Sequence, residues 1–272
     1  MSTRSQKFTD VPSLGGGRVT LVGAGPGDPE LLTIKAVRAM QDADVILFDA
    51  LVSEEVLAFA RATAKRMLVG KRGHRPSCRQ DDINALMLKL ARQGKHVVRL
   101  KAGDPVMFGR AGEEIAYLEL ADVPVTIVPG ITAASAMASR LGVSLTHRDH
   151  AHSVRFVTGH SRNGAVPSDL DWRGLADGET TLVIYMGGRT GAECARRLIK
   201  EGLTPATPCI VACSVSREDE ALHAGTLGDL AAGSLIGDGE KPILIGIGAV
   251  FKDRSALGPS VHRDLRTERV PA

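Results

Sequence analysis

The chain has 272 residues, 43% of them hydrophobic and 24% charged, so it suits one large domain or two small ones, each with a real core. A net charge of +3 does not require a polyanionic partner, and 3% aromatic residues argue against a nucleic-acid binder built on stacking platforms. No apolar run approaches the roughly 18 residues of a membrane span, and the polar N-terminus lacks the apolar core of a signal peptide. We therefore predict a cytoplasmic protein that binds neither nucleic acid nor membranes.

The cysteines and histidines show no pattern typical of a metal site. The cysteines form no C-x-x-C pair and have no histidine cluster nearby; they are Cys78, Cys194, Cys209 and Cys213. His147 and His160 are single histidines without other ligands beside them. We expect buried or free thiols in a reducing compartment, and no bound metal.

Strands and helices alternate through the first half of the chain. Residues 1–17 read as a flexible arm that ends in three glycines. The expected strands are 19–22, 45–48, 67–69, 96–100 and 125–128. Helical spacing of apolar residues predicts helices between them, including one over about 53–61 with Ser53 as its N-cap. This rhythm indicates a parallel, doubly wound sheet, and its topology brings several loops to one edge, with Gly25, Asp49, Lys71, Asp104 and Thr132.

The second half begins between Ile131 and Ser153 and has a more varied pattern. Its expected strands are 154–158, 181–185, 209–213, 221–225 and 243–247. One helix over 191–201 and several hairpin-like spacings predict a mixed sheet. We divide the chain into an N-terminal α/β domain over 18–132, a C-terminal α/β domain over 133–252 and a flexible tail over 253–272.

The segment from Arg99 to Glu114 joins a buried strand to a helix and is rich in small residues. Gly103 and Gly109 would let a ligand approach bare backbone, but an ordinary tight connection fits equally well. Asp104 lies between Gly103 and Pro105, a setting for either an Asx-turn or a carboxylate that faces a ligand. The segment alone leaves both interpretations open.

The glycine-rich loop over 23–28 first suggests a dinucleotide-binding enzyme, with Asp49 as the acid that binds ribose. The spacing is wrong for that motif, because the third glycine would fall on Asp28. Pro26 also removes a backbone N–H where a pyrophosphate needs donors. We therefore disfavour nicotinamide binding.

Arginines and one methionine are the other candidates. Eight arginines fall in loops or at helix ends near the expected edge, where several together would suit a polycarboxylate through bidentate pairs; each alone is more simply a solvated surface residue. They are Arg72, Arg75, Arg79, Arg110, Arg140, Arg148, Arg155 and Arg162. Met186 ends a strand beside Gly187, where it would either fill the core or present its thioether to an adenine or a sulfonium.

Several segments together resemble one family, the uroporphyrinogen-III C-methyltransferases of the tetrapyrrole methylase superfamily. The similarity covers roughly residues 18–250. The matching segments are Gly23 to Thr33, Asp49 to Ser53, Val69 to Arg72, Arg99 to Glu114, Val128 to Ala133, Leu145 to Arg148 and Tyr185 to Gly187. Their number and order make the resemblance highly specific.

The resemblance implies a homodimer of two-domain α/β subunits that bind S-adenosylmethionine in the cleft between the domains, without a metal. It implies two successive methyl transfers to uroporphyrinogen III, a polycarboxylated reduced tetrapyrrole, to give precorrin-2 for sirohaem or cobalamin. The region for dehydrogenase and chelatase activity of bifunctional sirohaem synthases is not in this sequence, so we expect methylation only.

The resemblance also implies roles for individual residues. The family's proposed proton acceptor falls on Asp49 and its proposed proton donor on Lys71. We take Arg72, Arg110 and Arg148 as candidates for binding the acidic substrate. The residues that would bind the cofactor are Pro26, Ala102, Gly103, Asp104, Met107, Thr132, Ala133, Met186, Val215 and Leu244.

Three positions depart from the family pattern. Ala102 stands where a glycine is usual, which would strain the chain by about 1 kcal/mol or more if that position needs a positive φ. Ala50 replaces a bulkier polar or basic residue, and the segment from Cys213 to Arg217 lacks the usual glycine or alanine.

Three other functions stay open at this point. The chain could be a different corrinoid-pathway C-methyltransferase that acts on a later precorrin. It could also be an NAD-linked oxidoreductase or a tetrapyrrole carrier without catalytic activity. Binding of S-adenosylhomocysteine rather than NADH would separate a methylase from an oxidoreductase.

Overall fold

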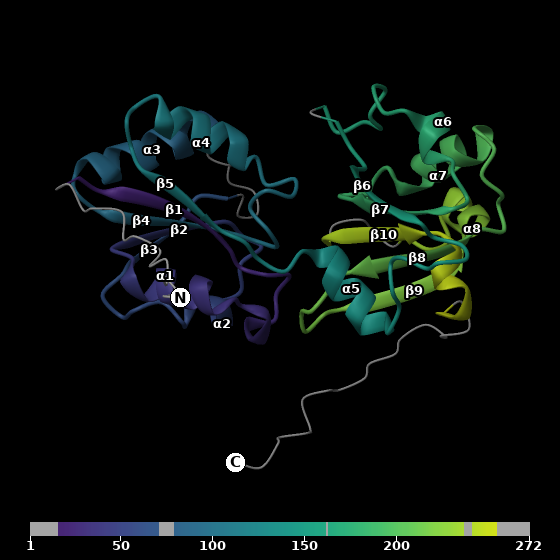
Figure 1. The fold of residues 1–272 in the computed structure, drawn as a ribbon, viewed down its shortest axis with the longest axis horizontal. Coiled ribbons are helices and arrows are strands. Elements are labelled where there is room, and N and C mark those ends of the chain that lie inside the picture. Colours follow the sequence, from purple (N-terminus) through teal and green to yellow (C-terminus); the bar gives the residue numbers. More distant parts are fainter. Residues whose placement is uncertain (1–15, 71–78, 162, 237–240, 255–272) are drawn as a thin grey trace, which may run out of the picture. The chain divides into compact units, whose positions relative to one another are not determined.

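The computed structural model describes residues 16–70, 79–161, 163–236 and 241–254 of the chain. The chain divides into two compact units (Figure 1). Unit 1 comprises Met1–Ala24 and Leu32–Gly130, and unit 2 comprises Gly25–Leu31 and Ile131–Ala272. The short segment Gly25–Leu31 therefore groups with unit 2, although the sequence places it inside the first domain.

Unit 1 contains a five-stranded sheet in the order β3-β2-β4-β1-β5, and every pair of neighbouring strands is parallel. Its elements are β1 (Arg18–Gly23), α1 (Ile34–Asp42), β2 (Val45–Phe48), α2 (Glu54–Leu57), β3 (Lys65–Leu68), α3 (Gln80–Arg92), β4 (His96–Lys101), α4 (Ala111–Glu119) and β5 (Val125–Val128). The expected alternation and parallel sheet are confirmed.

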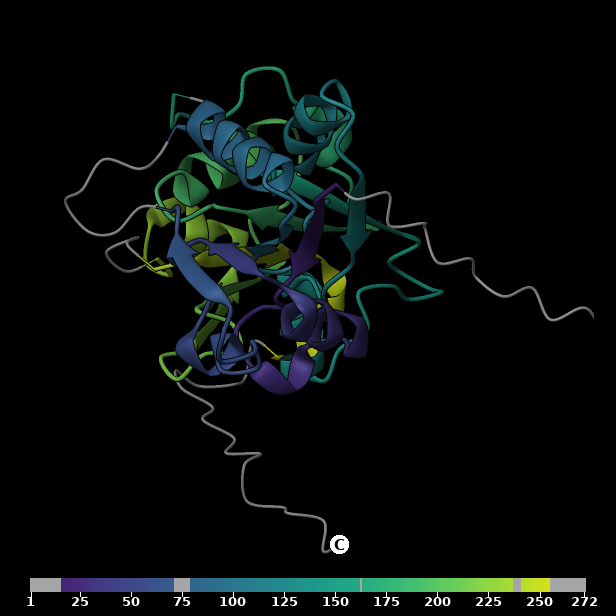
Figure 2. The same ribbon diagram turned by 90° about the vertical axis from the view of Figure 1, so that its left-hand side faces the viewer.

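Helices cover both faces of the sheet in unit 1, as Figures 1 and 2 show, with α1 and α2 on one face and α3 and α4 on the other. Alternate residues of β4 face opposite sides because the side-chain period of a strand is two. Val98 and Leu100 join the core beneath α1 and α2, whereas Val97 joins the core beneath α3 and α4. Arg99 and Lys101 share the face of Val97 by the same alternation.

Helix α2 is shorter than the sequence predicts. It begins as expected, because the Ser53 hydroxyl accepts a hydrogen bond from Val56 N, but it ends at Leu57 rather than near 61. Phe59 N and Ala60 N instead donate to carbonyls three residues earlier, which tightens the chain into turns. The prediction of a helix to residue 61 was therefore wrong.

Unit 2 contains a five-stranded sheet in the order β6-β7-β10-β8-β9, in which β6 and β7 are parallel and the other pairs antiparallel. Its elements are η1 (Pro29–Leu31), α5 (Ala133–Leu141), β6 (Ser153–Thr158), α6 (Trp172–Leu175), β7 (Thr180–Tyr185), α7 (Gly191–Lys200), β8 (Pro208–Cys213), β9 (Ala221–Thr226), α8 (Leu227–Ala232), β10 (Ile243–Ile247) and η2 (Ala249–Arg254). The predicted mixed sheet is confirmed. The expectation of one helix between its strands was wrong, since α6 and α8 are too short to show a helical period in sequence.

The second sheet also separates two apolar layers. Leu182, Ile184 and Val211 pack with residues of α6, α7 and α8, whereas Val183 and Leu244 pack with α5 and η2. Within the described ranges no helix is long and apolar enough to cross a membrane.

Three of the four cysteines lie in the described part of unit 2. Cys194, Cys209 and Cys213 are buried and free of disulfides, as expected, while Cys78 lies outside the described residues. Burial raises the pKa of Cys194 to about 11 and that of Cys209 above its usual range. Both thiols are therefore protonated at neutral pH and are poor nucleophiles.

His96 begins β4 and is buried as a neutral side chain in unit 1. Its Nδ1 lies 3.1 Å from the Arg18 guanidinium and 3.2 Å from the Asp42 carbonyl oxygen, and its Nε2 lies 2.9 Å from Thr20 Oγ1. Burial, and then the charge of Arg18, lower the pKa of His96 below the ordinary histidine value of 6.5. The folded state therefore resists protonation of this ring.

This burial predicts a loss of stability on acidification. Below the unfolded value of 6.5 the unfolded chain binds a proton that the folded chain rejects, so the free energy of unfolding should fall as pH drops towards the folded pKa of His96. Urea unfolding between about pH 7.5 and about pH 5 measures this slope. His96→Gln, which has no titratable ring, should show a shallower slope. An unchanged slope in that variant would contradict the assignment.

Candidate functional site

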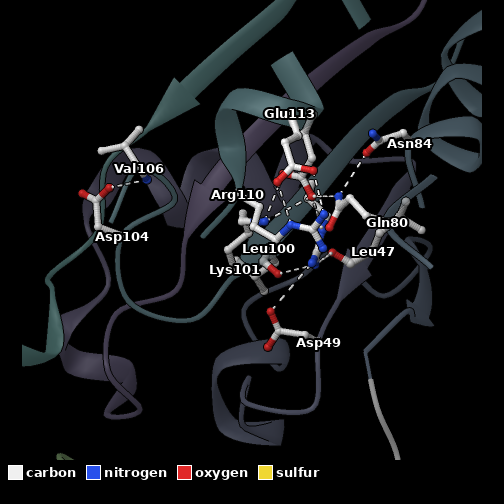
Figure 3. A network of polar contacts seen from close by, with 12 residues as sticks. Leu47, Asp49, Gln80, Asn84, Leu100, Lys101, Asp104, Val106, Arg110 and Glu113 are labelled. Carbon is white, nitrogen blue, oxygen red and sulfur yellow. Dashed lines mark hydrogen bonds and ion pairs between the residues drawn. The ribbon is translucent and has the colours of Figure 1, made fainter. Parts of the chain in front are cut away.

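The loop after β4 presents bare backbone at the edge of the first sheet. Gly103 has a φ of +68°, and a Cβ built on it would meet no atom within 4 Å. Asp104 closes the loop: its Oδ1 accepts from Val106 N at 2.9 Å (Figure 3), and its Oδ2 accepts from Gly130 N at 3.2 Å. The carboxylate is thus an Asx-turn that also binds the end of β5. These two hydrogen bonds fix the loop in which the backbone of Gly103 borders open space.

The ends of β1, β4 and β5 approach one another closely. A Cβ on Gly130 would collide with the carbonyl oxygen of Gly103 and with the backbone of Gly23. Only glycine fits at such a contact. Three loops of unit 1 are therefore held together through backbone atoms.

Asp49 directly follows β2, the neighbour of β4 in the sheet. Its Oδ1 accepts from Leu51 N at 3.1 Å, and its Oδ2 lies 3.8 Å from the Arg99 guanidinium. The side chain is 26% exposed. Gly70 packs against it so closely that any Cβ there would lie 2.8 Å from the Asp49 Cβ. The next two residues, Lys71 and Arg72, lie outside the described residues.

A buried cluster of charges lies next to Asp49, and sequence reasoning missed it. Glu114 is fully buried, and its carboxylate lies 3.0 Å from Lys101 Nζ and 3.3 Å from Arg99 Nε (Figure 3 shows the network). Burial, with the charge of Arg99, lowers the pKa of Lys101. From the sequence, Glu113 and Glu114 suit the first turn of a helix, where they do lie, but that placement does not reveal that Glu114 is buried. The usable signal was the pair of cations at alternate positions, Arg99 and Lys101, in a strand predicted to be buried.

The rest of this loop has a constrained backbone. Phe108 and Arg110 have φ values of 55° and 58°, in the left-handed region, and Arg110 precedes α4. The Arg110 guanidinium donates to both Glu113 carboxylate oxygens at 2.6 and 2.8 Å, which raises the pKa of Arg110. Met107 is half-buried. Ala102 does not have a positive φ, so the backbone strain expected for an alanine at a glycine position does not arise.

In unit 2, Met186 follows Tyr185, whose hydroxyl contacts Thr132. Met186 has a φ of 59° and a 41% exposed side chain. The Tyr185 hydroxyl forms a short hydrogen bond with Thr132 Oγ1 and accepts from Ala134 N at 3.3 Å. The end of β7 therefore fixes the start of α5, where Thr132 and Ala133 lie half-buried.

The loop after β8 is shaped by two further left-handed residues, Ser214 and Ser216, with φ values of 49° and 61°. Glu220 accepts from Ser216 N at 2.5 Å and from Arg140 Nε at 2.7 Å, which ties this loop to α5. Gly27 lies against Ser216, and a Cβ there would be 2.9 Å from its carbonyl oxygen.

The remaining predicted residues of unit 2 differ in exposure. Val215 and Leu244 are 6% and 3% exposed and belong to the apolar core, and Pro26 is buried. Such residues can offer a ligand little besides their backbone atoms. Arg148 is exposed, in a loop closed by a bridge between His147 and Ala151. Among the described residues no group of three acidic, histidine or cysteine side chains is arranged to hold a metal.

These features fit S-adenosylmethionine better than a dinucleotide. The open backbone at Gly103 provides amide groups without a side chain to exclude a ligand, and a carboxylate fixes that loop. In unit 2 the Met186 side chain, a soft thioether, is 41% exposed. At the end of β4 a diphosphate would meet the Asp104 carboxylate rather than a helix N-terminus with free amides.

Comparisons with known proteins point in the same direction. The model of the Tetrapyrrole (Corrin/Porphyrin) Methylases matches residues 18–231. Siroheme synthase 1 of Yersinia enterocolitica is 48% identical over 234 residues, which are 86% of this chain and 49% of the relative. The chain therefore spans about half the length of the curated relatives it matches.

Solved structures give matches over nearly their full length. A uroporphyrin-III C-methyl transferase from Thermus thermophilus, complexed with S-adenyl homocysteine, is 41% identical with a TM-score of 0.75, covering 87% of this chain and 100% of that one. A cobalt precorrin-4 methyltransferase is 28% identical with a TM-score of 0.73, covering 85% and 94%.

The contrast between Ala102 and Gly103 gives a direct prediction. Ala102→Gly should lower the free energy of unfolding by only about 0.5–1 kcal/mol, because glycine loses more backbone entropy on folding. Gly103→Ala should cost about 1–2 kcal/mol, because alanine is strained at positive φ. It should also weaken binding of S-adenosylhomocysteine, since its methyl group occupies the open space beside the backbone.

Urea unfolding and calorimetric titration with S-adenosylhomocysteine measure the two effects. A larger loss of stability in Ala102→Gly than in Gly103→Ala would contradict the assigned backbone conformations. Undiminished affinity in Gly103→Ala would remove the open backbone from ligand binding.

Proposed function

The chain belongs to the tetrapyrrole (corrin/porphyrin) methylases, and we propose that it is an S-adenosylmethionine-dependent C-methyltransferase that methylates uroporphyrinogen III twice to give precorrin-2. Precorrin-2 leads to sirohaem and cobalamin. Support comes from the siroheme synthase and uroporphyrin-III C-methyl transferase relatives together with the sequence motifs.

One observation in unit 1 carries the proposal furthest. Asp49 and the loop with Gly103 follow β2 and β4, which are neighbouring parallel strands, so a carboxylate and an open stretch of backbone share the C-terminal edge of one sheet. Ligands of parallel α/β sheets bind at that edge. A methyl transfer to carbon needs both a positioned cofactor and a group that receives the proton.

We assign the cofactor to backbone and apolar contacts. In unit 1 these residues are Ala102, Gly103, Asp104 and Met107, and in unit 2 they are Pro26, Thr132, Ala133, Met186, Val215 and Leu244. S-adenosylmethionine, when bound, supplies an electrophilic methyl group on a sulfonium. The protein's contribution is to hold the attacking pyrrole carbon in line with that methyl, which needs no covalent intermediate with the protein.

Asp49 is the proposed proton acceptor. When the pyrrole carbon forms its new bond the ring becomes cationic, and loss of a proton from the ring returns a bonding electron pair to it. A carboxylate at the edge of the sheet stabilises that cation and accepts the proton. Asp49 is suited to this role because its side chain is partly exposed and its Oδ1 is fixed by Leu51 N. We assign proton donation to Lys71.

The substrate carries carboxylates, and Arg72, Arg110 and Arg148 are the proposed partners. Arg110 is already paired with Glu113, and both side chains are about half exposed, at 55% and 52%. A substrate carboxylate would therefore compete with Glu113 for the same guanidinium. Replacing the Glu113 carboxylate by a substrate carboxylate on the Arg110 guanidinium costs little free energy, because the existing ion pair is exposed.

We further propose that the enzyme is a cytoplasmic homodimer, as the resemblance implies. The buried, free thiols of Cys194 and Cys209 fit a reducing compartment. A solution mass of a single chain by light scattering would contradict the dimer.

Anaerobic incubation with uroporphyrinogen III and S-adenosylmethionine, followed by mass spectrometry, tests the function. We expect a product heavier by two methyl groups. The absence of methylated product would reject the substrate, and methylation of a later precorrin instead would favour the activity named for the cobalt precorrin-4 relative.

In the same assay, Asp49→Asn should lower turnover on the order of 100-fold, because the amide cannot accept the proton. Affinity for S-adenosylhomocysteine should stay near the wild-type value. Asp44→Asn, which alters a carboxylate just before the same strand, is the matched control and should keep its turnover. Wild-type turnover in Asp49→Asn would remove this residue from the chemistry.

A further inference from the structure

The Arg99 guanidinium donates three hydrogen bonds within unit 1, and its NH2 group faces Asp49. Its NH1 group donates to the carbonyls of Leu47 and Leu100 at 3.3 and 3.0 Å, and its Nε donates to Glu114 at 3.3 Å. The side chain is only 6% exposed. A guanidinium bound in this way cannot swing, because each rotation would break buried hydrogen bonds.

Glu114 is in turn fixed by residues other than Arg99. Lys101 Nζ donates to both carboxylate oxygens at 3.1 and 3.0 Å, and Gln80 Nε2 donates at 3.0 Å while also donating to Asn84 at 3.0 Å. The two cations Arg99 and Lys101 are balanced by the carboxylates of Glu114 and Asp49. The chain of contacts thus runs from α3 and α4, through β4, to the end of β2.

The contact between Arg99 and Asp49 is an ion pair and not a hydrogen bond. At 3.8 Å it is longer than a hydrogen bond, so it attracts the carboxylate without occupying a lone pair. Within the described ranges Asp49 Oδ2 has no hydrogen-bond donor, whereas Oδ1 is held by Leu51 N. One oxygen is therefore anchored, and the other keeps its capacity to accept a proton.

A second pair in the same unit shows what a purely structural contact looks like. Asp44, just before β2, has one oxygen 2.6 Å from Arg61 and the other 2.8 Å from His96 N. Both of its oxygens are engaged. The two ends of β2 thus carry aspartate–arginine pairs of different design.

We propose that Arg99, held by Glu114 and Lys101, is a positioning residue that fixes the Asp49 carboxylate with Oδ2 turned towards the substrate. The role rests on the proposed function, in which Asp49 accepts the proton. Arg99 itself touches neither substrate nor cofactor in this account. Its effect on turnover passes entirely through Asp49.

Two variants of Arg99 test the role by a double-mutant cycle with Asp49→Asn. Arg99→Lys keeps the charge but removes the planar fork, and Arg99→Gln removes the charge while leaving the pair of Lys101 and Glu114 intact. We expect each to lower kcat by at least about tenfold, as a misplaced reacting group does, with little change in KM for S-adenosylmethionine. In an Asp49→Asn background, neither change should lower kcat further.

Arg61→Gln is the matched control, since it breaks the pair at the other end of β2 and should leave kcat unchanged. The same fold-loss for Arg99→Lys with and without Asp49→Asn would overturn the proposal, because an indirect structural effect is additive. So would wild-type kcat in Arg99→Lys. If circular dichroism shows that Arg99→Gln is unfolded, the double-mutant cycle of Arg99→Lys with Asp49→Asn decides the question.

A readout independent of turnover separates this inference from the proposed function. Three-bond NMR couplings report the χ1 rotamers of Asp49. One rotamer is expected in the wild type and averaging among several in Arg99→Lys, even if uroporphyrinogen III proves not to be the substrate. Identical couplings in the two proteins would contradict the positioning role, whereas an inactive wild type would count only against the proposed function.

Discussion

The fully buried carboxylate of Glu114 is what allows β4 to carry two positive charges into unit 1. Arg99 and Lys101 project from the same face of a strand that also carries the buried apolar residues Val97, Val98 and Leu100, and unpaired cations there would cost several kcal/mol each. Glu114 contacts both, and Gln80 completes its hydrogen bonds. The arrangement couples α4 to the strand that leads into the loop with Gly103. It also sets the guanidinium beside Asp49.

Both units hold their loops by carboxylates and by constrained backbone. Asp104 bridges from its own turn to Gly130 in unit 1, and Glu220 accepts from Ser216 N and Arg140 Nε in unit 2. Positive φ values occur at Phe108 and Arg110 in unit 1 and at Met186, Ser214 and Ser216 in unit 2. Non-glycine residues adopt that region at a cost, and clusters of them occur at functional sites. In both units these residues lie in loops that follow strands.

Much of this architecture follows from sequence because it rests on local patterns. The alternation of strands and helices predicts the parallel sheet, and the hairpin-like spacings predict the mixed one. The end of α2 and the helices α6 and α8 were missed, because a helix of four to six residues has no visible period. Tight turns also resemble a helix in composition.

Some residues of the candidate site can likewise be proposed from sequence, and others cannot. Gly103, Asp104 and Asp49 could be proposed from the sequence because their residue types and positions after strands suggest a ligand. Glu114 could not, since its partners Arg99 and Lys101 become visible only when α4 is placed over β4. Ala102 shows the reverse case: a family pattern suggests strain there, and the structure has ordinary backbone at that position, with the positive φ at Gly103 instead.

The most direct test of this account is the stability of Glu114→Gln beside that of its neighbour Glu113→Gln. Glu113 pairs with Arg110 at an exposed site, so its loss should cost at most about 1 kcal/mol in urea unfolding. Loss of the Glu114 charge leaves Lys101 buried without its counterion and Arg99 with only the longer ion pair to Asp49, and should cost about 3 kcal/mol or more. Equal, small losses in the two variants would contradict the dependence of unit 1 on its buried carboxylate.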